Sequence, residues 1–328
     1  MPTETFPTIE IISKDIESVT LRKTVPGPYK LLLFTDLHLD GRADTSARTL
    51  ARMTDAILRE KPDLVLLGGD NVTGGNNEAR SHELARLFED LGVYWGGVLG
   101  NHEGDNPDSI TRRHMMEVFT SYSHCIMRQG PAEIDGDCNY YIRLLRADGT
   151  TEQIIFCLDT FDEISSKQRA TLAILPGKKY DGAHPNQVAW YQQKAAALQS
   201  ESPAAKSLLL LHIPLPAYDK ALAAGPLQYG DCKEDICSTA YENGLFEAIR
   251  ESGSTQAVFC GHDHINNCGV RYQGILLSYI EMSGYSSYGM KNSGAPESAW
   301  LQGYTVLTFD GDGICKPEQK LYASIYND

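Results

Sequence analysis

Short apolar runs that alternate with amphipathic stretches are the feature that most constrains the fold of this chain. Apolar runs typical of buried strands end near residues 34, 67, 99, 211 and 260. Between them, apolar residues at helical spacing predict helices over residues 45–60, 78–91, 109–121, 185–199 and 241–251. The repeated order of strand, helix and strand predicts an α/β fold with its elements packed in layers.

The second half of the chain carries more strand signals than the first. Residues 140–158 contain two apolar runs joined by Ala-Asp-Gly at 147–149, which predicts a hairpin, and a second hairpin is expected across residues 310–313. We find no sequence repeat, low-complexity tract or linker. The 328 residues are long enough for one large domain or two ordinary ones. We expect a single domain over residues 1–328, with its core at about 28–328 after a short N-terminal extension.

Composition and charge narrow the class of protein. Hydrophobic residues make up 42% and charged residues 22% of the chain, as in ordinary globular proteins. No apolar run approaches the roughly 20 residues that span a bilayer, so we expect no membrane association. The first thirty residues lack a basic start and an apolar core, so no signal peptide is visible and a cytoplasmic location is expected. The net charge of −14 repels polyanions, so nucleic acid is not expected as a partner.

The eight cysteines show no C-x2-C pair, so the sequence gives no support to a structural zinc site. A chain of this length does not depend on disulfides, and cysteines inside apolar runs are ordinarily buried free thiols. Cys232 and Cys237 lie close together in a polar segment. They are therefore the candidate pair for a disulfide bond.

Five apolar runs end in polar residues of the kind that bind metals. The sequences at these ends are DLH at 36–38, GDN at 69–71, GNHE at 100–103, HIP at 212–214 and GHDH at 261–264. Taken singly, an Asp after a strand is often a turn residue or helix cap, and a His there is often a half-buried structural residue. Taken together they predict one site, because open α/β sheets place their ligands at the carboxyl ends of strands.

Spacing and residue type indicate metal chemistry. Alternate residues of an extended segment point the same way, so D-x-H and H-x-H can each present two donors to one site. Glycines before Asp70, Asn101 and His262 allow close backbone approach. Seven donors with one bridging carboxylate make eight bonds, four for each of two ions. Carboxylate, amide and imidazole ligands without thiolate suit manganese, iron or zinc.

These motifs resemble those of the calcineurin-like metallophosphoesterases: D-x-H, G-D, G-N-H-[DE], a lone His after a strand, and G-H-x-H, in that order. The segments HIPLP at 212–216, GHDHINN at 261–267 and GYSSYG at 284–289 resemble the purple-acid-phosphatase-related branch. The resemblance implies two stacked mixed β-sheets flanked by helices, with a dinuclear metal centre at the carboxyl ends of the strands.

The resemblance also implies roles for individual residues. The first ion would be held by Asp36, His38 and His264, the second by Asn101, His212 and His262, and both by Asp70. His102 matches the catalytic histidine of the family.

One position departs from the relatives. Purple acid phosphatases carry a tyrosine ligand where this chain has Thr73, so no purple colour is expected and His38 would supply the missing ligand. In calcineurin the same position is an acid that supports the catalytic histidine. Thr73 cannot act as a carboxylate, which leaves Glu103 and Asp105 as candidates for orienting His102.

The function implied is hydrolysis of a small phosphomonoester by in-line attack of a metal-bridging hydroxide. A phosphodiesterase acting on a small diester or cyclic nucleotide is the alternative within enzymes, and a catalytically silent metal-binding scaffold is the alternative from another class. Residues 213–239 form a long polar segment typical of a lid or binding loop. Candidate contacts for the organic part of the substrate are Tyr218, Tyr229, Tyr285 and Tyr288. The sequence leaves the oligomeric state open.

Overall fold

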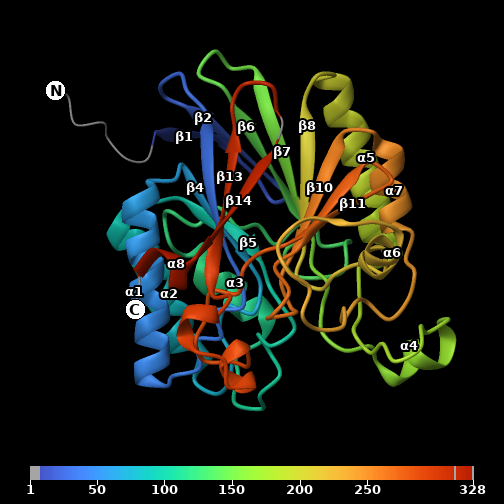
Figure 1. Cartoon of the computed structure of the whole chain (residues 1–328). Helices are drawn as coiled ribbons and strands as arrows, with labels where there is room; N and C mark the ends of the chain where they lie inside the picture. The colour runs from blue at the N-terminus through green and yellow to red at the C-terminus, as the bar shows by residue number, and fades with distance from the viewer. Residues whose placement is uncertain (1–7, 314, 327–328) are drawn as a thin grey trace.

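The computed structural model describes residues 8–313 and 315–326, and its strands form two sheets (Figure 1). The larger sheet has the strand order β1-β2-β6-β7-β8-β10-β12-β11-β9. Its strands are β1 Ile9–Lys14, β2 Ser18–Lys23, β6 Tyr140–Leu145, β7 Thr151–Cys157, β8 Lys206–Leu210, β9 Leu227–Tyr229, β10 Thr255–Cys260, β11 Gly269–Tyr272 and β12 Ile275–Tyr279. The smaller sheet has the order β14-β13-β3-β4-β5. Its strands are β3 Tyr29–Phe34, β4 Leu64–Gly68, β5 Trp95–Val98, β13 Gly303–Phe309 and β14 Lys316–Leu321.

Helices cover the outer sides of the two sheets. Figure 1 places α1 and α2 on the side of the smaller sheet and α5, α6 and α7 on the side of the larger one. The helices are α1 Ala43–Glu60, α2 Asn77–Leu91, α3 Arg112–Thr120, α4 Ser166–Thr171, α5 Pro185–Glu201, α6 Ala217–Ala224, α7 Leu245–Ser252 and α8 Tyr322–Tyr326, with 3-10 turns η1 Met290–Ser293 and η2 Glu297–Ala299. The prediction of a mixed α/β fold with two mixed sheets flanked by helices is confirmed.

Alternation along the strands divides the core into two large clusters. In β7, Ile155 belongs to the cluster that includes residues of both sheets, whereas Ile154 and Phe156 pack with residues of α5 and α7. Successive side chains of a strand point to opposite faces, so this sheet is apolar on both sides. That explains why its central strands β7, β8 and β10 contain continuous apolar runs rather than an alternating pattern.

The N-terminal segment is part of the fold. We expected residues before about 28 to be an extension of the core, but β1 and β2 form one edge of the larger sheet, where β2 pairs with β6 in parallel. Val19 and Leu21 are fully buried. Lys23 of β2 forms a buried ion pair with Asp63 at 2.8 Å, with 7% of each side chain exposed. The pair links this edge of the larger sheet to the start of β4 in the smaller one.

Several local predictions are confirmed and others need correction. The hairpins β6–β7 and β13–β14 form as expected. The segment 213–239 is not one irregular loop, because it contains α6 and β9. All eight cysteines are free thiols, so Cys232 and Cys237 are not bridged. Within the described residues, no helix combines the length and apolarity needed to cross a bilayer.

Candidate metal centre

The two sheets bring the carboxyl ends of five strands together. The parallel strands β3, β4 and β5 of the smaller sheet lead into four predicted ligands: Asp36, His38, Asp70 and Asn101. The parallel strands β8 and β10 of the larger sheet lead into three: His212, His262 and His264. All seven are buried, with at most 7% of any residue exposed.

Six of the seven form two overlapping groups of donor atoms. Asp36, His38, Asp70 and His264 each offer one atom within 4.8 Å of the others, and Asp70, His212 and His262 form a second such group. Asp70 belongs to both groups, as expected of a bridging carboxylate. The seventh residue, Asn101, places its Oδ1 3.1 Å from His212 Nε2, which puts this amide oxygen beside the second group.

In the first group, the nitrogen and oxygen atoms that could bind a metal lie close together and face one another. His38 Nε2 lies 3.1 Å from His264 Nε2, and His264 Nε2 lies 3.3 Å from Asp36 Oδ1. Asp36 Oδ1 is buried and has no hydrogen-bond partner. A buried carboxylate oxygen without a partner is costly. A cation bound between these atoms would satisfy them all, so the residues fit a metal ion.

Backbone contacts orient the imidazoles toward this centre. His212 Nδ1 lies 2.8 Å from the carbonyl oxygen of Gly68, and His264 Nδ1 lies 3.0 Å from that of Tyr288. Each Nδ1–H donates to its carbonyl, which leaves Nε2 to bind a metal. A partner of this kind fixes the ring orientation of metal-binding histidines.

Burial and the neighbouring carboxylates set the protonation states of the histidine ligands. It lowers the pKa of His38 to about 4 and that of His262 to about 3, so both imidazoles are neutral near pH 7. Burial also lowers the pKa of His212, but Asp70, with Oδ2 3.3 Å from His212 Nε2, outweighs it and raises the pKa to about 10. Histidine binds metal in its neutral form, so occupation of this group releases that proton.

Close backbone packing requires glycine at two strand ends. A Cβ on Gly100 would lie 2.2 Å from Asp70 Oδ1, and one on Gly261 would lie 2.1 Å from Thr35 Oγ1 and 2.5 Å from Asp36 Oδ2. These two glycines therefore let the ends of β3, β4, β5 and β10 approach closely enough for Asp36 and Asp70 to share one site. The sequence-based expectation of close approach before Asn101 and His262 agrees with this packing.

His102 lies at the open side of the centre. Its ring centre is 5.4 Å from that of His38, its backbone N–H donates to Asp70 Oδ1 at 2.8 Å, and 43% of its side chain is exposed. Its Nδ1 contacts the Asp105 carboxylate, so Asp105 orients the ring. Glu103 has another role: it accepts from the backbone N–H groups of Asn71 and Gly100, at 2.7 and 2.8 Å.

The four candidate tyrosines lie in different places. Tyr288 stacks on His264 with ring centres 4.0 Å apart and is 43% exposed, so it borders the centre. Tyr218 is buried and donates to the carbonyl of Val258, inside the apolar cluster behind the larger sheet. Tyr218 lies on α6 and its side chain faces the larger sheet, where it is 1% exposed, so the structure does not place it where it could contact a substrate.

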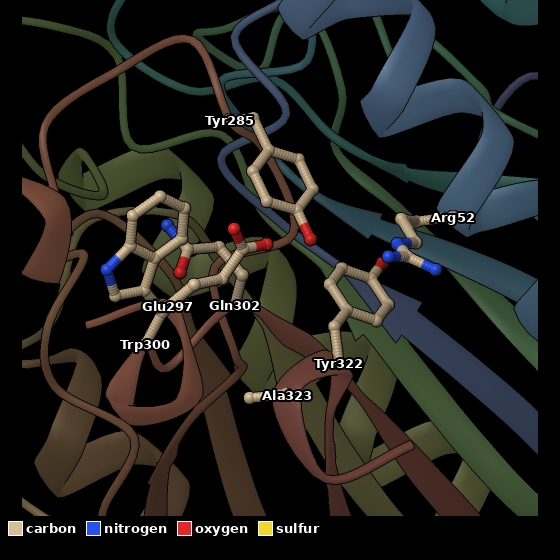
Figure 2. Close-up of a pocket in the computed structure, with 7 residues that line it drawn as sticks. All are labelled: Arg52, Tyr285, Glu297, Trp300, Gln302, Tyr322 and Ala323. Carbon is tan, nitrogen blue, oxygen red and sulfur yellow. The ribbon is translucent and has the colours of Figure 1, made fainter. Parts of the chain in front are cut away.

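Tyr229 and Tyr285 are also engaged elsewhere. The Tyr229 hydroxyl contacts Ser278 Oγ at 2.8 Å on the edge of the larger sheet. Tyr285 is 4% exposed and lines a small cavity together with Tyr322 and Arg52 (Figure 2). The structure places neither side chain against a ligand of the centre.

Tyr180 is a neighbour of the centre that sequence reasoning missed. Its ring packs edge to face on His262, with ring centres 4.3 Å apart. It lies in a segment without a recognisable motif, and its backbone pairs with Glu163 and Thr239, so its position beside His262 depends on the tertiary fold. No signal in the sequence alone identifies it.

Comparisons with known proteins agree with this geometry. "Probable inactive purple acid phosphatase 14" from Arabidopsis thaliana is 27% identical over 313 residues, covering 86% of this chain and 77% of its own. "Phosphatase DCR2" from Saccharomyces cerevisiae is 25% identical, covering 78% of this chain and 47% of its own. The crystal structure of a dimetal phosphatase from Danio rerio shares the fold, with a TM-score of 0.52 at 16% identity, over 90% of this chain and 99% of the other.

A sequence model described as "Calcineurin-like phosphoesterase" matches residues 29–266, which span all five motifs. The resemblance inferred from the motifs is thereby confirmed, and the chain belongs to the calcineurin-like phosphoesterase family.

Proposed function

We propose that this protein hydrolyses small phosphomonoesters at the centre built by the five strand ends. The observation that supports this most directly is that six of the seven candidate ligands form two groups that share Asp70, with the seventh, Asn101, beside the second group. Two bound metal ions of the manganese, iron or zinc type would activate water and neutralise the phosphoryl oxygens. Relatives with "inactive" in their names make activity the first property to test.

The chain's own residues supply the remaining parts of the reaction. Asp105 holds Nδ1 of His102, so Nε2 is the nitrogen that is free to face a substrate. From the open side of the centre it can donate a proton to the leaving oxygen. The buried ligands exclude bulk water from the opposite side, since the strand ends and the apolar core lie beneath them.

Charge favours a small monoester over a polymer. With 43 acidic and 29 basic residues, the protein repels long polyanions. Small diesters and cyclic nucleotides carry less charge than a polymer, so repulsion does not exclude them as substrates of the same centre. For that reason the assay must include a diester.

The decisive experiment compares p-nitrophenyl phosphate with bis-p-nitrophenyl phosphate on protein loaded with manganese, iron or zinc. We expect faster turnover of the monoester. Asp70→Asn is expected to lose activity and bound metal together, because both groups of donors use this carboxylate. His102→Ala should lower kcat by about a hundredfold or more while its metal content stays that of the unaltered protein.

Other outcomes have equally clear meanings. Preference for the bis-ester would make the protein a phosphodiesterase. Fully loaded protein that hydrolyses neither ester would favour a metal-binding scaffold. Unchanged activity of Asp70→Asn would refute the assignment of the centre.

A further inference from the structure

A cavity of about 370 Å³ lies beside the candidate metal centre. Its size is within the range of small-molecule sites in proteins. It is formed by two segments that are far apart in the sequence, 176–180 and 235–238. Apart from the general expectation of a binding loop over residues 213–239, neither segment carries a recognisable sequence motif.

Two walls of the cavity touch the segment that carries His262 and His264. The Tyr180 ring, which lines the cavity, packs on His262 with an interplanar angle of 87°. On the other wall, the backbone N–H of Cys237 donates to Asp263 Oδ2 at 3.1 Å. Asp263 stands between the two histidine ligands. Tyr180 thus borders both the cavity and a ligand of the centre, so an ester group that extends from a bound phosphate across the Tyr180 ring would enter the cavity.

The cations of the cavity are already paired. Lys178 Nζ lies 3.0 Å from Asp219 Oδ2, and Lys179 Nζ contacts the Glu163 carboxylate while lying 4.8 Å from the centre of the Tyr180 ring. The cavity is also lined by Asp235. With both ammonium groups neutralised and one further carboxylate present, the cavity offers no net positive charge to a second anionic group of a substrate.

The remaining lining is largely apolar or aromatic. Pro176, Gly177, Ile236 and the Tyr180 ring contribute to it. Two aromatic rings in contact attract each other more strongly than the area that they bury would predict. The lining therefore suits a flat, uncharged group better than a charged or strongly hydrated one.

We propose that this cavity is the leaving-group subsite of the protein and that Tyr180 is its specificity-determining residue. The substrate class is then an aryl phosphomonoester whose aromatic group carries no further negative charge. This inference rests on the proposed function, because it assumes that the phosphoryl group binds at the neighbouring centre.

Binding of phosphonates tests the subsite without requiring turnover. Phenylphosphonate, methylphosphonate and 4-carboxyphenylphosphonate are titrated calorimetrically into the manganese-loaded protein. We expect phenylphosphonate to bind at least about fivefold more tightly than methylphosphonate, and the carboxylated compound to bind more weakly than phenylphosphonate because of Asp235. In Tyr180→Leu the preference for phenyl over methyl should disappear, with the affinity for methylphosphonate unchanged.

A matched control substitutes a tyrosine far from the centre. Tyr272 is half-buried on β11 and its ring packs on Phe246, so Tyr272→Leu should retain the full phenyl preference. In kinetic assays, Tyr180→Leu is expected to raise KM for phenyl phosphate, while competitive inhibition by inorganic phosphate stays constant. A merely structural role of Tyr180 would instead weaken phosphate inhibition as well.

The outcomes separate this inference from the proposed function. Equal affinities for phenyl- and methylphosphonate, or an intact preference in Tyr180→Leu, would overturn the subsite while hydrolysis of esters still supported the function. Tighter binding of the carboxylated compound would overturn the assignment to uncharged groups. Absence of both phosphonate binding and ester hydrolysis would refute the function and the subsite together.

Discussion

Single residues at the centre adopt backbone conformations that side chains ordinarily avoid. Asp36, His38, Asp70 and His262 have φ values of 52°, 45°, 50° and 79°. Such left-handed conformations cost on the order of 1–3 kcal/mol each in a non-glycine residue. Four of the seven candidate ligands carry this cost, so the surrounding strands must impose it. Their donor atoms are thereby aimed at the centre before any ion binds.

The same close packing makes Gly261 sensitive to a single added carbon. Gly261→Ala places Cβ against Thr35 Oγ1 and Asp36 Oδ2, so we expect Asp36 to move and the first ion to be lost, with activity below detection. Elemental analysis measures the loss. Gly225→Ala is the control, since a Cβ there meets no atom within 4 Å. Full metal content in Gly261→Ala would contradict the packing argument.

Motif residues were predictable from the sequence, whereas the neighbours that shape the cavity were not. Asp70 and His262 follow apolar runs at strand ends, so their convergence follows from the rule for open α/β sheets. The positions of Tyr218 and Tyr180 could not be predicted from the sequence in this way. Both tyrosines lie in segments of mixed composition. Only tertiary packing buries Tyr218 in the core and places Tyr180 against His262.

At the scale of elements, strands β1 and β2 were missed for a physical reason. Their sequences, IEIISK and SVTLRK, alternate apolar and polar residues, as expected at the half-exposed edge of a sheet. Continuous apolar runs indicate only strands that are buried on both faces. The central strands β3, β4, β8 and β10 are of that kind and were identified.

The ion pair that joins β2 to β4 should be costly to break. Among the residues that the structure describes, Lys23→Met leaves the buried Asp63 carboxylate with two uncharged donors, the Thr8 hydroxyl and the Lys30 N–H. We expect the free energy of unfolding to fall by about 3 kcal/mol, measured by urea denaturation. The control is Arg22→Met on the same strand: its pair with Glu10 is exposed and should contribute less than about 1 kcal/mol. Equal effects of the two changes would contradict the role of burial.

Helix α5 begins at a histidine held between two carboxylates. His184 Nδ1 lies 2.7 Å from Asp135 Oδ2 and Nε2 lies 3.1 Å from Asp181 Oδ2. The hydrogen bond with Asp181 is the largest contribution to a raised pKa of His184, and the bond with Asp135 adds to it, against the effect of burial. Protonated His184 therefore stabilises the folded state.

This stabilisation has a defined pH window. It is fully present below the ordinary pKa of 6.5 and is lost as the pH rises through the higher pKa of the folded state. We expect His184→Gln to lower Tm more at pH 6 than at pH 8.5. His114→Gln, at a more exposed histidine on α3, is the control. A Tm difference for His184→Gln that is the same at both pH values would refute this.

At the scale of the whole molecule, the candidate centre joins the two sheets. Four ligands come from the smaller sheet and three from the larger, and each ion would use both: His264 of the larger sheet lies in the group of Asp36 and His38, and Asp70 of the smaller lies in the group of His212 and His262. An ion that binds only the folded arrangement stabilises the fold by mass action.

Metal removal should therefore destabilise the protein. At a free metal concentration about 100 times Kd, the expected stabilisation is about 2.7 kcal/mol for one site. Calorimetry with and without chelator measures the corresponding drop in Tm, and re-addition of metal should restore it. Asp70→Asn should show a much smaller response. An identical Tm with and without metal would mean that the ions do not bridge the sheets.

Because the ligands are divided between the two sheets, the ribosome synthesises them at different times. All four ligands of the smaller sheet lie within the first 101 residues, and the three of the larger sheet lie between 212 and 264. Synthesis proceeds from the N-terminus, so the growing chain exposes Asp36, His38 and Asp70 well before their partner His264 exists. Neither ion can be enclosed until the last of the five motifs, at residues 261–264, has emerged from the ribosome.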